Sequence, residues 1–131
     1  MDEFLRNQID EMRAKKVALI QDYDKSEAVN SFLVNGDRMW LDKNTRVGLV
    51  NSTQVAKAAG AEYIVLWTND KSYNVPCDTM LQMLAVLELY AMECYNVTAE
   101  HIAKVNALED LNRIYNYNYT KGYPKRLSFE L

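Results

Sequence analysis

The stretch that decides the fold is residues 78–95, which read DTMLQMLAVLELYAMECY. It contains no glycine or proline, and its apolar side chains lie on nearly every side of a helix: Met80, Leu81, Met83, Leu84, Val86, Leu87, Leu89, Tyr90 and Met92. A helix without a polar face is typical of an element that is buried on several sides. We therefore predict that residues 78–95 form the core helix of the protein, with Asp78 as its N-cap.

The sequence after the core helix predicts a break and then a shorter helix. Residues 96–98 interrupt the apolar pattern, and the hydroxyl of Thr98 can cap a new helix by accepting a hydrogen bond from a free main-chain amide. We expect this helix to run to about Leu111, because apolar side chains recur there at helical spacing, at Ile102, Val105 and Leu108. From Tyr115 onward we predict an extended tail.

Ahead of the core helix, residues 62–68 and 71–75 predict a hairpin. Both runs are rich in β-branched and aromatic residues, and Pro76 stops the second one. The first run is apolar at successive positions, so both faces of its strand would be apolar. That pattern predicts a central strand covered by helices, whereas the alternating second run is typical of a strand nearer a sheet edge.

A second hairpin is predicted around Asn35-Gly36, which is flanked by short apolar runs. This dipeptide tolerates the positive φ angles that a type I′ turn requires. With these two residues as the loop, Phe32 faces Met39 across the strands and Leu33 faces Arg38. The side chains on the inward face are then Phe32, Val34 and Met39.

Residues 43–59 lie between a residue suited to start a helix and a residue suited to end one. Asp42 is suited to accept a hydrogen bond from the unpaired amides of a first helical turn, and Gly60 is suited to the left-handed conformation that comes after a last turn. We expect a helix over about 43–59, weakened by Gly48 by about 1 kcal/mol relative to alanine.

Residues 3–22 predict an amphipathic N-terminal helix of about five turns. Its apolar positions alternate in steps of four and three, at Leu5, Ile9, Met12, Leu19 and Tyr23, with Lys16 at one seam position. A stripe this narrow fits a coiled-coil seam that oligomerises or docks the protein, and it fits equally a helix that packs back on its own domain. Both interpretations remain open at this stage.

Together these elements predict an α+β fold, in which a small, mostly antiparallel sheet of two hairpins packs on helices behind an N-terminal amphipathic helix. The expected organisation has three parts. Residues 1–24 form the N-terminal helix, residues 29–112 form a compact domain, and residues 113–131 form a tyrosine-rich extended tail.

The composition limits the classes of partner. Fifteen Lys and Arg against eighteen Asp and Glu give a net charge of −3 and no basic block longer than Lys15-Lys16, so nucleic acid is not an expected partner. The first residues lack the pattern of a secretory signal, and no long apolar run predicts a membrane span. Cys77 and Cys94 are expected to be free, buried thiols in a reducing compartment.

Residues for catalysis or for a cofactor are not evident. The single histidine, His101, is expected to be a partly exposed helix residue, because the chain has no second imidazole to complete the commoner metal sites. A thiol such as Cys94 within an apolar helix is inert, and four scattered glycines make no phosphate-binding loop. We therefore expect a protein that is not an enzyme, holds no metal or cofactor, and acts through contact with a partner.

The most distinctive local feature is residues 115–120, which read YNYNYT. In an extended chain this alternation places Tyr115, Tyr117 and Tyr119 on one side. Such rings can stack on sugars or fill grooves on a partner, or they can pack on the protein's own helices and strands. The candidate partner-binding residues are thus these three tyrosines and the helix positions Leu5, Ile9, Met12 and Leu19.

Several positions resemble an uncharacterised domain family that recurs in bacteriophage and prophage genomes, often in or beside tail-fibre and tail-assembly proteins. The resemblance spans about residues 30–110 and begins with Phe32, Gly36, Trp40, Asp42, Thr45-Arg46 and Leu49. It continues through the strand at Trp67, the helix from Asp78 and the region of Ile102 and Val105. Segments 29–32, 40–42 and 122–124 are similar to a subgroup from gut Bacteroidales and their phages.

The resemblance implies a context rather than an activity, because the family has no established catalytic residues. It suggests a virion component or assembly factor that is made in the cytoplasm of the bacterial host. The first expectation is a phage structural or tail-fibre accessory protein that binds other phage structural proteins and forms a homo-oligomer, expected to be a trimer through residues 3–22. The alternatives are a transient tail-fibre assembly chaperone and a carbohydrate-binding tip that uses the tyrosines.

Overall fold

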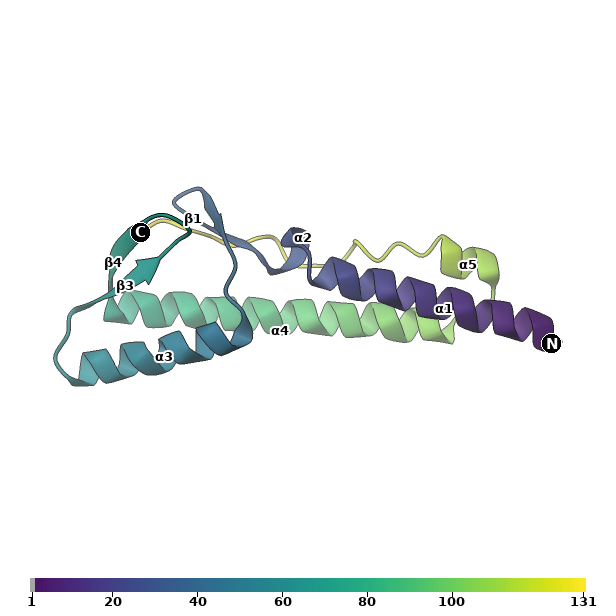
Figure 1. The fold of residues 1–131 in the computed structure, drawn as a ribbon, viewed down its shortest axis with the longest axis horizontal. Helices are drawn as coiled ribbons and strands as arrows, with labels where there is room; N and C mark the ends of the chain where they lie inside the picture. The colour runs from purple at the N-terminus through teal and green to yellow at the C-terminus, as the bar shows by residue number, and fades with distance from the viewer. Residues whose placement is uncertain (1) are drawn as a thin grey trace. The chain divides into compact units, whose positions relative to one another are not determined.

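The computed structural model describes residues 2–131 and has the α+β class expected from the sequence (Figure 1). Its elements in chain order are α1 (Glu3–Asp24), α2 (Glu27–Asn30), β1 (Phe32–Val34), β2 (Asp37–Met39), α3 (Lys43–Ala58), β3 (Tyr63–Trp67), β4 (Ser72–Pro76), α4 (Cys77–Ala107), α5 (Leu111–Tyr115) and β5 (Ser128–Phe129).

The chain forms two compact units. Unit 1 comprises the residues up to Asn30 together with Met92–Pro124, and unit 2 comprises Ser31–Ala91 together with Lys125–Leu131. These units divide the chain differently from the expected ranges 1–24, 29–112 and 113–131. The reason is that the long helix α4 contributes residues to both units, and the C-terminal segment is shared between them as well.

The helix α4 is longer than predicted and has no break at residues 96–98. The expected cap, Thr98, uses its hydroxyl elsewhere: it donates to Asp24 Oδ1 at 2.8 Å and lies 2.6 Å from the hydroxyl oxygen of Tyr123. The prediction of a separate helix over residues 98–111 is therefore wrong. The next helix after α4 is the short α5, whose N-cap Asp110 accepts hydrogen bonds from two main-chain amides.

The beginning of α4 also differs from the expectation. The helix starts at Cys77, directly after Pro76, so Asp78 lies in its first turn instead of capping it. The Asp78 carboxylate pairs with Lys57 Nζ at 2.5 Å, and that hydrogen bond raises the pKa of the Lys57 ammonium.

In unit 2 the first hairpin agrees with the sequence analysis. Asn35 and Gly36 have φ angles of 49° and 85°, as a type I′ turn needs. Phe32 pairs with Met39 and Leu33 with Arg38. The inward face is buried in the core of the unit, which consists of Phe32, Val34, Met39, Leu66, Val75, Met80, Met83, Leu84 and Leu87.

The last residues of the chain extend this hairpin into a three-stranded sheet, with the order β2-β1-β5. β5 runs parallel to β1, which the sequence did not predict, and Leu33 N donates to Leu127 O at 2.9 Å while Asn35 N donates to Phe129 O at 2.8 Å. The Phe129 ring meets the Phe32 ring edge-on at a centroid distance of 5.9 Å. Residues 125–131 of the tail thus complete unit 2 instead of standing free.

The second hairpin forms with the predicted strands but is a separate, two-stranded sheet of β3 and β4. Ile64, Leu66 and Val75 face inward, whereas the other face of β3 is open to solvent. The prediction that β3 is a central strand covered by helices is therefore wrong. Alternation of side chains explains the outcome, because only every second residue of a strand reaches the helix below it.

The helix α3 begins and ends where the sequence indicates. Asp42 is its N-cap and accepts a hydrogen bond from Thr45 N at 2.7 Å, and this bond lowers the pKa of the Asp42 carboxyl. Gly60 follows the C-cap Ala59 with a φ of 92°, the left-handed conformation that favours glycine.

In unit 1 the apolar stripe of α1 packs within the unit. Its core consists of Ile9, Ile20, Val105 and Ile114, with Leu5, Met12, Val17, Ile102, Leu108, Leu111, Tyr117 and Tyr119 against it. The stripe follows Leu5, Ile9, Met12, Lys16 and Ile20 around the helix. Leu19, which the sequence analysis placed on this stripe, is 47% exposed, whereas the Ile20 side chain is fully buried.

Candidate functional site

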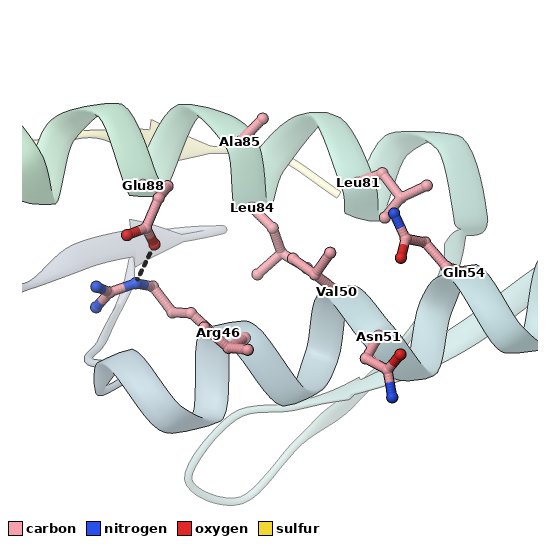
Figure 2. A pocket seen from close by; sticks show the side chains of 9 residues that line it. Arg46, Val50, Asn51, Gln54, Leu81, Leu84, Ala85 and Glu88 are labelled. Atoms are coloured by element: carbon pink, nitrogen blue, oxygen red, sulfur yellow. Dashed lines mark hydrogen bonds and ion pairs between the residues drawn. The ribbon is translucent and has the colours of Figure 1, made fainter.

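An apolar groove lies between α3 and α4 in unit 2, and we call it the α3–α4 groove. It has a volume of about 590 Å³. Figure 2 shows Val50 of α3 and Leu84 of α4 pointing toward one another across it. The lining residues are Arg46, Val47, Val50, Asn51, Gln54, Leu81, Leu84, Ala85 and Glu88.

The groove exists because α3 covers α4 only in part. Thr53 is the one buried residue among those described in α3, and its hydroxyl donates to Leu49 O within the helix at 2.6 Å. Val47 and Val55 are exposed on the same helix, and Leu49 and Val50 are only half-buried. The helix therefore keeps apolar side chains that no element of its own unit covers.

An ion pair lies at one end of the groove. Arg46 Nε donates to Glu88 Oε2 at 3.0 Å, and Arg46 Nη1 donates to the Leu41 carbonyl at 2.7 Å (Figure 2). The guanidinium is mostly shielded from solvent, and the Glu88 carboxylate is about half exposed. The groove thus combines an apolar floor with a charged, oriented end, a combination that gives a docked helix both affinity and direction.

A second apolar surface lies on the outer face of β3, which we call the β3 face. Tyr63, Val65 and Trp67 are 57%, 43% and 69% exposed. They point to the same side because residues two apart in a strand share a face. Aromatic side chains on such a patch are typical of a contact surface for another protein.

The helix residues proposed from sequence as a partner seam are used inside unit 1. Ile9 is buried, Leu5 and Met12 are partly buried against the same core, and Leu19 points to solvent on a different side of α1. The helix thus packs back on its own unit, the second of the two interpretations. The trimer expected through residues 3–22 relied on an exposed apolar stripe, and that stripe is packed inside unit 1.

The three tyrosines do not form one platform. Tyr115 ends α5 and is exposed, whereas Tyr117 and Tyr119 are partly buried against the core of unit 1. The Tyr117 hydroxyl lies 2.6 Å from His101 Nδ1, and the Tyr119 ring meets the Tyr23 ring edge-on at 5.7 Å. The alternation fails at its first ring because residue 115 is helical, and the extended tail predicted from Tyr115 starts later.

His101 is buried, which corrects the expectation of a partly exposed residue. Its Nε2 lies 2.7 Å from the Lys121 carbonyl, and since a carbonyl only accepts, Nε2 carries the proton. In the neutral imidazole, Nδ1 then accepts a hydrogen bond from the Tyr117 hydroxyl. Burial raises the pKa of the Tyr117 hydroxyl and of the hydroxyl of Tyr123, whose ring lies beside the His101 ring. These groups fasten residues 117–123 to α4.

A smaller, polar hollow of about 220 Å³ in unit 2 contains two carboxylates, those of Asp37 and Asp70. Asp37 is paired with Lys71 at 3.2 Å, and this hydrogen bond raises the pKa of the Lys71 ammonium. Both side chains of the pair are about half exposed. A solvent-open ion pair lacks the desolvated setting that tunes catalytic carboxylates, so we do not take this hollow as a candidate active site.

Within residues 2–131, no three His, Cys, Asp or Glu side chains are grouped so that they could hold a metal ion. Over the same range no helix combines the length and apolar character that crossing a bilayer requires. Cys77 and Cys94 are buried thiols that are not joined in a disulfide, and their sulfurs lie near the main-chain carbonyls of Ala61 and Val29.

Sequence reasoning missed both candidate surfaces. The apolar residues that line the α3–α4 groove resemble ordinary core positions in the sequence, and the partial cover of α4 by α3 leaves Val47, Val50 and Leu81 accessible. The five consecutive apolar residues of β3 indicated apolar side chains on both faces, but they did not show that residues 2–131 cover one face only. Comparisons of the chain with protein-family models, curated proteins and solved structures gave no match.

Proposed function

We propose that the protein works by binding another protein, as a structural or accessory component of a bacteriophage tail or tail fibre. The α3–α4 groove is the observation that carries the binding part of this proposal. The phage context rests on the resemblance of residues 30–110 to the phage and prophage domain family. In this proposal the protein is made in the bacterial host cytoplasm and becomes part of the virion.

The groove favours an amphipathic helix as the docked element of the partner. Two helices side by side leave a channel into which the side chains of a third helix fit as ridges into grooves. An apolar stripe with spacing of three and four residues would cover the half-buried Val50 and Leu81 and would extend over the exposed Val47. A basic or amide side chain at one end of that stripe would meet the exposed edge of Glu88.

The experiment uses the tagged full-length chain expressed in a host that carries the phage, with retained proteins identified by mass spectrometry. Ala85→Glu places a charge in the groove on an exposed helix position. Gln82→Glu is the matched control, since Gln82 is exposed on the same helix and does not line the groove. We expect wild type and Gln82→Glu to retain a tail or fibre protein, and Ala85→Glu to lose it at least tenfold.

Retention that is equal in the three proteins would count against the groove, and retention of host proteins alone would count against the phage context. Mass spectrometry of purified particles then separates a virion component from a transient assembly chaperone, because a chaperone leaves before the particle is complete. The carbohydrate alternative has lost support, since Tyr117 and Tyr119 are engaged within unit 1.

A further inference from the structure

The outer edge of β3 offers unpaired main-chain groups. The hairpin is closed at one end by Thr68 N donating to Lys71 O at 2.7 Å, and at the other by Cys77 N donating to Glu62 O at 3.0 Å. Hydrogen-bonded pairs alternate with non-hydrogen-bonded pairs along an antiparallel ladder. The residues between those two ends that direct their N–H and C=O groups away from β4 are therefore Tyr63, Val65 and Trp67.

These are the same residues whose side chains form the β3 face. Because β3 and β4 form a sheet of two strands only, no further strand pairs with this edge among residues 2–131. In solution, water hydrogen-bonds to such free main-chain groups, and the ligand that matches the whole row of donors and acceptors at strand spacing is another extended polypeptide. The chemistry of the edge thus selects a β-strand as its occupant.

The two edges of the hairpin differ in a way that singles out β3. On β4 the outward-directed positions are Ser72, Asn74 and Pro76, and the proline has no N–H to donate. On β3 the outward positions carry neither a proline nor a charge. Proteins commonly use prolines and charges to keep exposed edges from pairing, and here only the β4 edge has such a feature.

We propose that β3 pairs antiparallel with β3 of a second copy of this chain, about a two-fold axis at Val65. The proposal does not depend on the α3–α4 groove. Pairing in this register gives a four-stranded sheet in the order β4-β3-β3-β4. Tyr63 of each copy lies opposite Trp67 of the other, and the outward N–H and C=O groups of three residues per strand satisfy about six hydrogen bonds.

The side chains of β3 make this pairing self-complementary. The strand reads Tyr-Ile-Val-Leu-Trp, with an aromatic residue at each end and a β-branched residue in the middle. Cross-strand aromatic pairs and β-branched pairs stabilise neighbouring strands. Just beyond the strand, Glu62 of one copy lies opposite Thr68 of the other, so like charges do not oppose one another in the paired segment.

The test measures the solution mass of the full-length chain by sedimentation velocity across the micromolar range. We expect wild type to show twice the chain mass of 15.2 kDa. Val65→Lys and Val65→Glu each place two like charges at the two-fold axis, so each variant should be monomeric. An equimolar mixture of the two variants should return to a dimer, because the charges then attract across the same pair.

Asn74→Lys is the matched control. Asn74 pairs with Val65 across the hairpin and is exposed on the same face, but it lies on the β4 edge. This variant should remain a dimer. A wild-type chain that is monomeric at every concentration would overturn the proposal, and so would a Val65→Lys variant that still dimerises. Failure of the mixed variants to recover the dimer would overturn the register.

Discussion

The ammonium group of Lys16 donates a hydrogen bond to the main-chain carbonyl of Tyr115 at 2.7 Å. The same nitrogen lies 5.7 Å from the ring centroids of both Tyr115 and Tyr119. A lysine on the buried stripe of α1 is therefore satisfied by a carbonyl and by the negative faces of two rings. The residue that interrupts the apolar seam is thus the attachment point of the segment after α5.

Replacing Lys16 tests this attachment. Lys16→Met keeps the length of the buried side chain but leaves the Tyr115 carbonyl without its donor. Leaving a buried carbonyl without a donor costs about 1–3 kcal/mol. Because this contact is only partly buried, we expect the free energy of unfolding to fall by about 1 kcal/mol, the lower end of that range. Urea unfolding followed by circular dichroism measures it. Lys15→Met, at an exposed neighbouring position, is the control; equal losses in the two variants would show that the buried contact contributes nothing specific.

The position of the buried stripe on α1 is tested by two adjacent residues. Ile20 is fully buried and Leu19 is 47% exposed. Ile20→Ala should lower the free energy of unfolding by about 2–5 kcal/mol because it leaves a cavity. Leu19→Ala should change it by about 0.5 kcal/mol or less. The reverse order, read from the same denaturation curves, would mean that α1 packs with a different face on the core of unit 1.

Alkaline pH should release the segment that contains Tyr117 and Tyr123. Burial raises the pKa of both hydroxyls above the ordinary value of 10.0. A group with a raised folded pKa contributes stability that is complete below its unfolded pKa and is lost as the pH rises through the folded pKa. The loss should therefore begin above pH 10, and a tyrosinate at position 117 also cannot donate to His101.

Tyrosinate absorbance measured together with circular dichroism follows this alkaline transition. The double variant Tyr117→Phe and Tyr123→Phe should start from a lower stability at neutral pH and lose less of it above pH 10. Tyr115→Phe, at an exposed ring, should behave as wild type. An alkaline transition that is unchanged in the double variant would assign the loss to other groups.

The two cysteines report on the two units separately. Cys94 belongs to unit 1 and Cys77 to unit 2, and both are buried. A thiol reagent should label each one slowly in the native protein, at a rate set by local opening. Ile20→Ala, which weakens the core of unit 1, should accelerate labelling of Cys94 more than that of Cys77. Mass spectrometry of digested, labelled protein gives both rates, and equal acceleration would indicate that the two units open together.

Local backbone chemistry explains which parts of the fold were predictable. The turn at Asn35-Gly36 and the end of α3 at Gly60 depend on the φ preferences of these residues. The start of α3 depends on the Asp42 side chain, which binds a main-chain amide of the same helix. The sequence predicted all three correctly because these causes are local. Thr98 carries the same capping preference as Asp42. The Thr98 hydroxyl instead binds the carboxylate of Asp24, which is distant in the sequence. No local sequence pattern indicates this partner, so the predicted cap was wrong.

Positions that depend on packing were less predictable. Leu19 and Ile20 are both apolar, and a helical repeat of about 3.6 residues against an assumed 3.5 shifts the buried stripe by about half a residue over five turns, enough to favour Ile20 over Leu19 at its end. The composition of β3 is the same for a covered strand as for an uncovered one. Neither the open edge of β3 nor the α3–α4 groove follows from spacing, because each depends on which elements fail to cover it.

The division of each unit into separate chain segments has a consequence for biosynthesis. The ribosome completes α1 before it reaches Val105 and Ile114, the residues that complete the core around Ile9 and Ile20. The strand β1 also emerges long before β5, its parallel neighbour. Neither unit can close until its second segment has been synthesised, and the nascent polypeptide carries a bare amphipathic helix until residues 105–114 have left the exit tunnel.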